Sequence, residues 1–88
     1  MTDPVDKKTL GKLLEELGEC TSATARCLIQ GIDEAEPITG KINRQWLQEE
    51  IADVYANLAL TVERFNLDID KKRIDSKMTR LKNWHTLA

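Results

Sequence analysis

Residues 43–65 read NRQWLQEEIADVYANLALTVERF, and this stretch decides the fold class. Its apolar side chains recur at the spacing of three and four residues that marks one face of a helix, without strand-like alternation. The repeating residues are Leu47, Ile51, Val54, Tyr55, Leu58, Val62 and Phe65. The pattern therefore predicts an amphipathic helix over residues 43–65, with Asn43 as its cap.

Two further helices are predicted on either side of this one. Asp3 followed by Pro4 favours a helix start, because a carboxylate caps free amides and proline fits the first helical position. The glycine- and proline-containing segment 31–42 separates that helix from the next. Asn66 can adopt the left-handed conformation that ends a helix, and Asp68 can cap the following one. The chain is therefore predicted to be all-α, a helical hairpin plus a third helix, with helices over about residues 4–30, 43–65 and 69–84.

The short chain is expected to associate with copies of itself. Its 88 residues form one domain spanning residues 1–88, and such a chain buries only roughly 60–65% of its unfolded surface. Each helix carries an apolar stripe, and a hairpin with one more helix leaves apolar surface open to water. We therefore expect a homodimer or a homotetramer whose helices complete four-helix bundles.

Composition excludes several classes of function. The 13 basic and 15 acidic residues give a net charge of −2, so no nucleic-acid partner is expected, because such binding needs a basic surface. No apolar run approaches the roughly 18–20 residues of a membrane span, and the N-terminus does not resemble a signal peptide. We expect no membrane partner and a cytoplasmic location. Cys20 and Cys27, seven residues apart on one helix, are too distant for a disulfide and are expected to be reduced core residues.

Each of the first two helices carries two carboxylates at positions i and i+3 beside its apolar face. These pairs are Glu16 with Glu19 and Glu50 with Asp53. Antiparallel packing is expected to bring all four around one point, where they repel one another unless they are protonated or bind a cation. Hard divalent cations prefer carboxylate oxygens, and the lack of an accompanying histidine favours Mg²⁺ or Mn²⁺ over iron. The pattern indicates metal-assisted phosphoryl or phosphodiester chemistry.

A structural interpretation of the same pattern stays open. Acidic residues three apart are common on helices, and a single pair is more often a solvated face than a site. Two such pairs, each beside the core stripe and on adjacent helices, are much rarer by chance.

The two acidic segments also resemble a known family. EELGE at residues 15–19 and EEIAD at residues 49–53 match the paired EExxE…EExxD signature of MazG-like nucleoside triphosphate pyrophosphohydrolases, an all-α superfamily. The likeness spans about residues 10–80, and the short chain looks most like small phage or prophage members. The resemblance implies Mg²⁺-dependent hydrolysis of a nucleoside triphosphate between its α- and β-phosphates, giving the monophosphate and pyrophosphate.

The resemblance also implies roles for individual residues. Glu15 and Glu49, the first letters of the motifs, become candidates for positioning water or supporting the metal ligands. Many family members carry a lysine followed four residues later by an asparagine on the last helix. Lys77 fits this pattern, but Leu81 stands at the asparagine position. The implied metal ligands are Glu16, Glu19, Glu50 and Asp53.

Further candidates for substrate binding follow from residue chemistry. Lys77 and Arg80 lie on one basic face of the third helix, which is either solvated or neutralises triphosphate charge. Asn57 is one turn beyond the second acidic motif and within reach of a metal-bound water or a nucleotide. Trp84 is either a stacking partner for a base or part of the core or an interface.

Two alternatives to nucleoside triphosphate hydrolysis remain at this point. One is a catalytically silent helical oligomerisation or interaction module in which a metal stabilises the acidic cluster. The other is an enzyme that acts on phosphoribosyl-ATP. The sequence does not indicate which base or which sugar a nucleotide substrate would carry.

Overall fold

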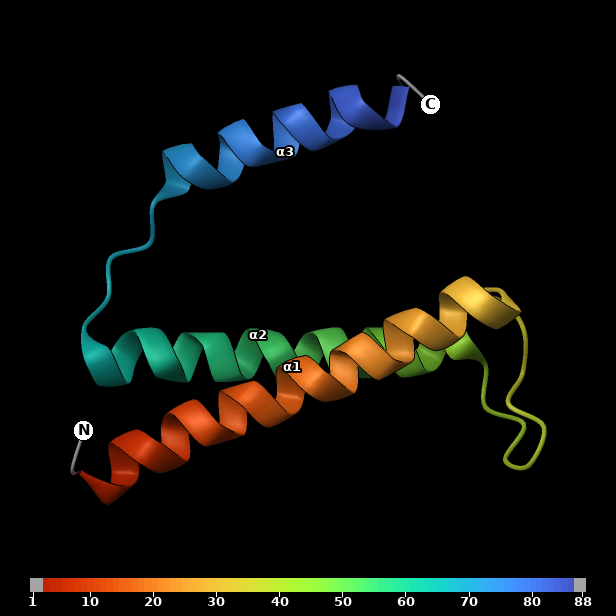
Figure 1. Ribbon diagram of the computed structural model, residues 1–88, viewed down its shortest axis with the longest axis horizontal. Helices are drawn as coiled ribbons and strands as arrows, with labels where there is room; N and C mark the ends of the chain where they lie inside the picture. The colour runs from red at the N-terminus through yellow and green to blue at the C-terminus, as the bar shows by residue number, and fades with distance from the viewer. Residues whose placement is uncertain (1–2, 87–88) are drawn as a thin grey trace.

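The computed structural model describes residues 3–86 and confirms the all-α class (Figure 1). The described residues contain no β-strand; one isolated antiparallel bridge joins Ala35 to Ile42 in the segment between the first two helices. No helix in this part of the chain combines the length and apolar character needed to cross a membrane. The helices are α1 (Pro4–Gln30), α2 (Asn43–Phe65) and α3 (Lys71–Thr86).

The start of α1 follows the prediction. Asp3 is the N-cap, and its side-chain oxygen accepts hydrogen bonds from the backbone amides of Val5 at 2.8 Å and Asp6 at 3.4 Å. Pro4 occupies the first turn, where its missing amide hydrogen costs nothing. The helix ends at Gly31, whose φ of 106° is a conformation that favours glycine.

The start of α2 corrects the prediction for Asn43. Ile42 holds the N-cap position without a side-chain cap, and Asn43 is the first helical residue, only 1% exposed. The amide nitrogen of Asn43 donates to Gln30 Oε1 at 3.2 Å and to the carbonyl of Gly31 at 3.0 Å. The side chain is drawn to these acceptors because they lie in the closed end of the hairpin. Asn43 therefore ties the first turn of α2 to the last turn of α1.

The start of α3 also differs from its prediction. Asn66 ends α2 in the left-handed conformation, with φ 51° and ψ 49°, as expected. The carboxylate that caps the next helix, however, belongs to Asp70, which accepts a hydrogen bond from the amide of Arg73 at 2.9 Å. Asp68 lies in the extended linker before it, so α3 begins at Lys71 rather than at residue 69. Both aspartates suit a cap, and the path of the linker selects the second.

The hairpin and α3 are spatially separate. α1 and α2 pack side by side, whereas no Cα atom of α3 lies within 8 Å of one in either helix (Figure 1). The radius of gyration is 16.2 Å, against about 12 Å for a compact domain of this length. The chain is therefore open, and within residues 3–86 α3 is not packed closely against either helix of the hairpin.

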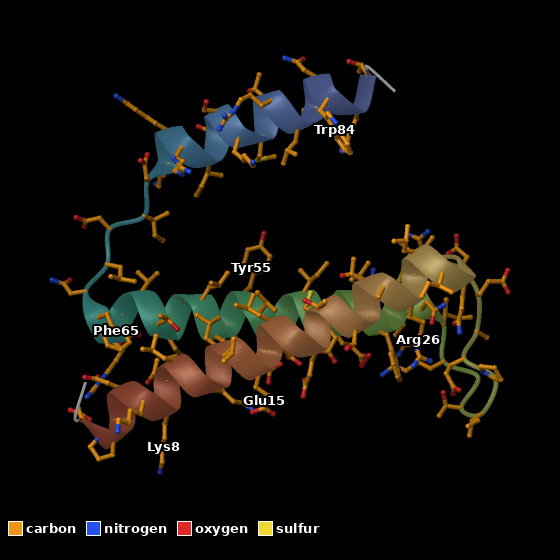
Figure 2. All side chains as sticks on the ribbon, in the orientation of Figure 1. Lys8, Glu15, Arg26, Tyr55, Phe65 and Trp84 are labelled. Atoms are coloured by element: carbon orange, nitrogen blue, oxygen red, sulfur yellow. The ribbon has the colours of Figure 1, made fainter. Side chains whose placement is uncertain are left out.

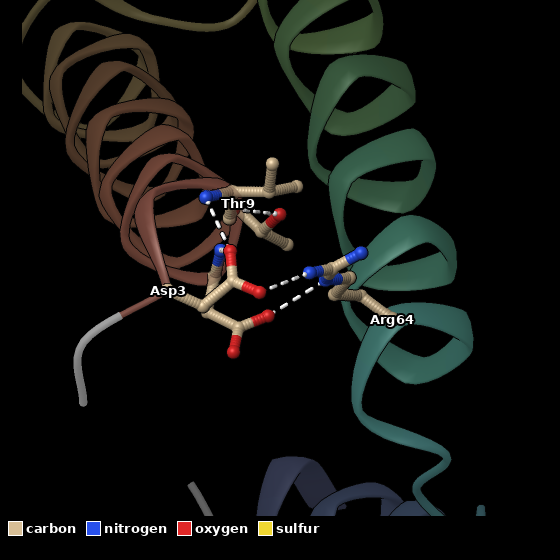
Figure 3. Close-up of polar contacts among 5 residues, drawn as sticks. Asp3, Thr9 and Arg64 are labelled. Atoms are coloured by element: carbon tan, nitrogen blue, oxygen red, sulfur yellow. Dashed lines mark hydrogen bonds and ion pairs between the residues drawn. The ribbon is translucent and has the colours of Figure 1, made fainter.

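An arginine closes the open end of the hairpin. Arg64, in the last turn of α2, donates to Asp6 at 2.6 Å and to Asp3 at 3.0 Å (Figure 3). These two hydrogen bonds raise the pKa of Arg64, mainly through Asp6. Asn43 at one end and Arg64 at the other thus fix α1 against α2.

Most apolar side chains of residues 3–86 are exposed to solvent or only half-buried. Among residues 3–86, Ala23 is the only hydrophobic residue that is buried. Cys20 and Cys27 are free thiols, as predicted, but they are half-buried rather than part of a closed core. Apolar exposure on this scale is unusual for a soluble monomer. Large exposed side chains occur on all three helices, including Leu14, Leu28, Tyr55, Leu60, Met78 and Trp84.

Candidate metal centre

Three carboxylates meet where α1 crosses α2. Glu16 comes from α1, and Glu50 and Asp53 come from α2; one oxygen of each lies within 4.8 Å of the others. Each residue borders the face that its helix turns toward the partner helix, as the spacing predicted. The structure thus brings together three of the four carboxylates expected to converge, and we call them the acidic triad. Their role as metal ligands stays a prediction.

The acidic triad leaves buried oxygens without partners. Glu16 is only 7% exposed, and its Oε2 atom is buried without a hydrogen bond; Glu50 Oε2 is in the same state. A buried carboxylate oxygen without a donor costs free energy, because it has lost water and gained nothing. The donor set is all oxygen and the local charge is negative. These residues therefore fit a hard divalent cation.

Glu19 stands outside the acidic triad. It is exposed, one turn beyond Glu16, and its carboxylate is not part of the group that meets within 4.8 Å. The negative charge of Glu16 raises the pKa of Glu19, with smaller contributions from burial and from Glu50. The fourth carboxylate thus stands apart from the acidic triad but is still affected by its negative charge.

Glu15 and Glu49 are exposed and engaged with lysines. Glu15 lies 3.4 Å from Lys12, and Glu49 lies 2.5 Å from Lys41. Figure 2 shows Glu15 on the side of α1 that faces away from α3. Neither carboxylate joins the acidic triad, so any role in the site comes from an adjacent position.

Lys12 is a site residue that the sequence analysis missed. Its Nζ atom lies 3.3 Å from Glu16 Oε1, and hydrogen bonds to Glu16 and then Glu15 raise the pKa of Lys12. The signal was present in the sequence, because Lys12 precedes Glu16 by four residues and so shares its helix face.

Asn57 lies beside the acidic triad but is folded onto its own helix. Its side-chain nitrogen donates to the backbone carbonyl of Asp53 at 2.8 Å. Asn57 and Lys12 also line one groove of about 370 Å³ between α1 and α2. The groove therefore begins one helical turn from the carboxylates, on both helices.

The candidates on α3 do not reach the acidic triad within one chain. Lys77 lines a separate depression on α3, together with Arg73 and Met78. Trp84 is 67% exposed, and its ring centroid lies 5.3 Å from that of His85. Arg80 is likewise exposed on the same helix. With α3 separate from the hairpin, these residues lie apart from the carboxylates of the same molecule, and their role in substrate binding stays a prediction.

The other aromatic residues of the hairpin have different surroundings. Trp46 is half-buried, and the guanidinium of Arg26 lies 4.5 Å from its ring centroid. This cation–π contact occupies one face of the indole. Tyr55, by contrast, is 71% exposed and projects from α2 on the side of α3 (Figure 2).

Comparisons with models of protein families, with curated proteins and with solved structures found no match to this chain. The resemblance drawn from the two acidic motifs therefore stays a prediction. The meeting of Glu16, Glu50 and Asp53 is independent of it, because that meeting follows from the packing of α1 on α2.

Proposed function

We propose that this chain is a Mg²⁺- or Mn²⁺-dependent nucleoside triphosphate pyrophosphohydrolase. Water would be added across the α–β phosphoric anhydride of an NTP or dNTP, breaking one P–O bond and forming another, to give the monophosphate and pyrophosphate. The observation that carries the proposal is the acidic triad with its two unpartnered buried oxygens. Such an oxygen-lined anionic site suits a cation that also attracts phosphate oxygens.

Each acidic residue has a distinct place in this proposal. Glu16, Glu50 and Asp53 hold the metal, and Glu19 joins them by rotating from the next turn of α1. The bound metal supplies charge neutralisation and a more acidic water. Glu15 and Glu49 position the attacking water or orient the metal ligands from the rim of the site.

The residues on α3 are proposed to serve the acidic triad of another copy. The exposed apolar side chains of the hairpin and of α3 support a homodimer or a homotetramer in which four-helix bundles cover them. Lys77 and Arg80 then face the phosphates, Trp84 stacks on the base, and Asn57 binds the nucleotide. Light scattering at micromolar concentration tests this arrangement, and a stable monomer would contradict it.

The reaction is tested with a panel of canonical and modified NTPs and dNTPs in the presence of Mg²⁺, with pyrophosphate release as the readout. We expect release by the parent chain and its near-complete loss in Glu50→Gln. Glu34→Gln removes the same charge from the loop, away from the acidic triad, and should leave the rate unchanged. The absence of release from every nucleotide would contradict the proposed reaction.

A second candidate is a catalytically silent helical module that oligomerises through its exposed apolar faces. The open arrangement of α3 favours it, because that helix is free to pack on another chain. Metal binding and oligomerisation without pyrophosphate release would identify this module. Phosphoribosyl-ATP belongs in the substrate panel, since an enzyme of that specificity would use the same acidic triad.

A further inference from the structure

Lys12 is the basic residue that the structure places against the acidic triad. Its ammonium lies 3.3 Å from Glu16 Oε1 and 3.4 Å from Glu15 Oε1. Among the ion pairs of residues 3–86, this is the one that involves a triad carboxylate. The positive charge offsets part of the repulsion among three converging carboxylates. Lys12 thus does for the metal-free protein part of what a cation would do.

Lys12 neutralises only part of the negative charge of the acidic triad. It engages Glu16 Oε1, whereas Glu16 Oε2 and Glu50 Oε2 stay buried and without a partner. One ammonium cannot balance three carboxylates, and its side chain is half-exposed at 55%. A divalent cation at the acidic triad would therefore compete with Lys12 for Glu16, and the two positive charges would repel each other.

The groove beside the acidic triad gives Lys12 an alternative partner. Lys12 and Asn57 lie at its triad end, and Lys8 adds a second ammonium one turn earlier on α1. Arg64 and Glu63 also line the groove; Asp3 and Asp6 already bind Arg64, and Glu63 adds one negative charge against the two ammonium groups. The volume of about 370 Å³ lies within the usual range of small-ligand sites. A phosphate chain in this groove would lie next to the acidic triad.

We infer that Lys12 is a placeholder cation that becomes a phosphate-binding residue. In the metal-free protein its ammonium neutralises Glu16; when a divalent cation takes the acidic triad, the ammonium turns to the phosphate chain of the substrate in the groove. This inference rests on the proposed function, since it assumes the metal site and a polyphosphate substrate. It adds a substrate contact from the same chain, independent of α3 and of any second copy.

The inference predicts two effects of opposite sign in Lys12→Gln. Without a competing ammonium, the nucleotide-free chain should bind Mn²⁺ about three- to tenfold more tightly. With Mn²⁺ present, inorganic tripolyphosphate should bind about tenfold more weakly, because a charge-assisted hydrogen bond is lost. Damage to the fold would weaken both interactions, so the opposite signs separate the two explanations.

Isothermal titration calorimetry on the full chain measures both affinities. Lys7→Gln is the matched control, because it removes the same charge from α1 at an exposed position outside the groove and the ion pairs. Its affinities should stay within about twofold of the parent values. Lys12→Arg keeps the charge and should return both affinities toward those of the parent.

The outcomes separate this inference from the proposed function. If the parent chain binds no Mn²⁺, the metal site fails and the inference falls with it. If the parent binds Mn²⁺ but Lys12→Gln binds it no more tightly, the placeholder role is wrong while the metal site stands. If Lys12→Gln gains affinity for Mn²⁺ and tripolyphosphate binding is unchanged, the phosphate-binding role is wrong.

Discussion

The hairpin and α3 share an amphipathic design but differ in what fixes their position. α1 and α2 are tied together at one end by Asn43 and at the other by Arg64. α3 is joined to them only through the linker at residues 66–70. The acidic triad is therefore built by contacts within one chain, whereas the placement of any group on α3 depends on what that helix packs against.

The largest effect is expected from substitutions in the acidic triad, which the hairpin holds in place. Glu16→Gln, Glu50→Gln and Asp53→Asn should each weaken Mg²⁺ binding and lower pyrophosphate release by at least about 100-fold, since even residues that only orient metal ligands cost 10–100-fold. Glu19→Gln, outside the acidic triad, should cost less. Calorimetric Mg²⁺ titration and pyrophosphate release measure the two effects.

Stability gives these variants an independent check. In the metal-free protein Glu50→Gln and Asp53→Asn relieve repulsion among the carboxylates, so the free energy of unfolding should stay equal or rise. Glu16→Gln also removes the ion pair with Lys12, so it is left out of this check. Urea unfolding in the presence of a chelator measures it. Parent-like Mg²⁺ affinity in all of the variants would show that the carboxylates converge without forming a metal site.

The next effect concerns α3. If Lys77 offsets charge on the pyrophosphate leaving group, Lys77→Ala should lower kcat by a factor on the order of 10–1,000, with Mg²⁺ binding intact. Lys71→Ala and Lys72→Ala, at the other end of the helix, are the controls for net charge. Three variants that behave alike would indicate a merely solvated basic face.

Mixing two impaired chains sharpens the same prediction. If α3 of one copy serves the acidic triad of the other, a Lys77→Ala and Glu50→Gln heterodimer contains one complete site. Random pairing in equal amounts should then restore about a quarter of the parent sites. Pyrophosphate release that does not rise on mixing would place Lys77 at the site of its own chain or at none.

A smaller effect is expected at the closed end of the hairpin. Asn43→Ala removes two hydrogen bonds from a residue that is 1% exposed, so unfolding should become easier by about 1–3 kcal/mol. Urea unfolding measures the change. Asn83→Ala, on α3, should change stability little, and equal losses at the two positions would contradict the special role of Asn43.

The smallest effect depends on pH. Amide and hydroxyl groups of Thr39, followed by the amide of Ile38, hold the pKa of Glu36 below its ordinary value. The lowered pKa means that ionised Glu36 stabilises the folded loop above its unfolded pKa, and this contribution is lost as pH falls through the folded value. Glu36→Gln should therefore lower the melting temperature slightly at pH 7 and less at pH 3. An equal shift at both values would exclude this cause.

The sequence predicted the existence and extent of the helices better than the residues that cap them. The apolar spacing in residues 43–65 and the Asp3–Pro4 start are local signals, and both gave correct bounds. Asparagine at position 43 suits a cap by residue type, but nearby acceptors in the tertiary structure draw its side chain elsewhere. The choice of Asp70 over Asp68 likewise depends on the path of the linker, which residue type does not encode.

The part of the candidate site that depends on which face of a helix a residue occupies could be predicted from the sequence. Spacing alone places Glu16 and Asp53 at the edge where α1 and α2 meet, and there the structure brings them together. Glu19 stands apart, because its final position depends on a side-chain rotamer that the helical spacing does not specify. For Lys77, the position relative to the acidic triad depends on packing beyond one hairpin, which a single sequence pattern cannot supply.

The bond from Asn43 to Gly31 has a practical consequence for protein engineering. Together with the bonds from the backbone amides of Asn43 and Arg44 to the carbonyls of Glu34 and Ile32, it holds the start of α2 against the end of α1, so the tip of the loop need not position the acidic triad. Ile38, 92% exposed at the tip of the loop, is then a suitable place to insert a peptide tag or a fluorescent label. It also follows that the two acidic motifs, 29 residues apart here, need not keep this separation for their carboxylates to meet. Chains with longer or shorter loops can present the same carboxylates, provided that the amide at the base of the loop is kept.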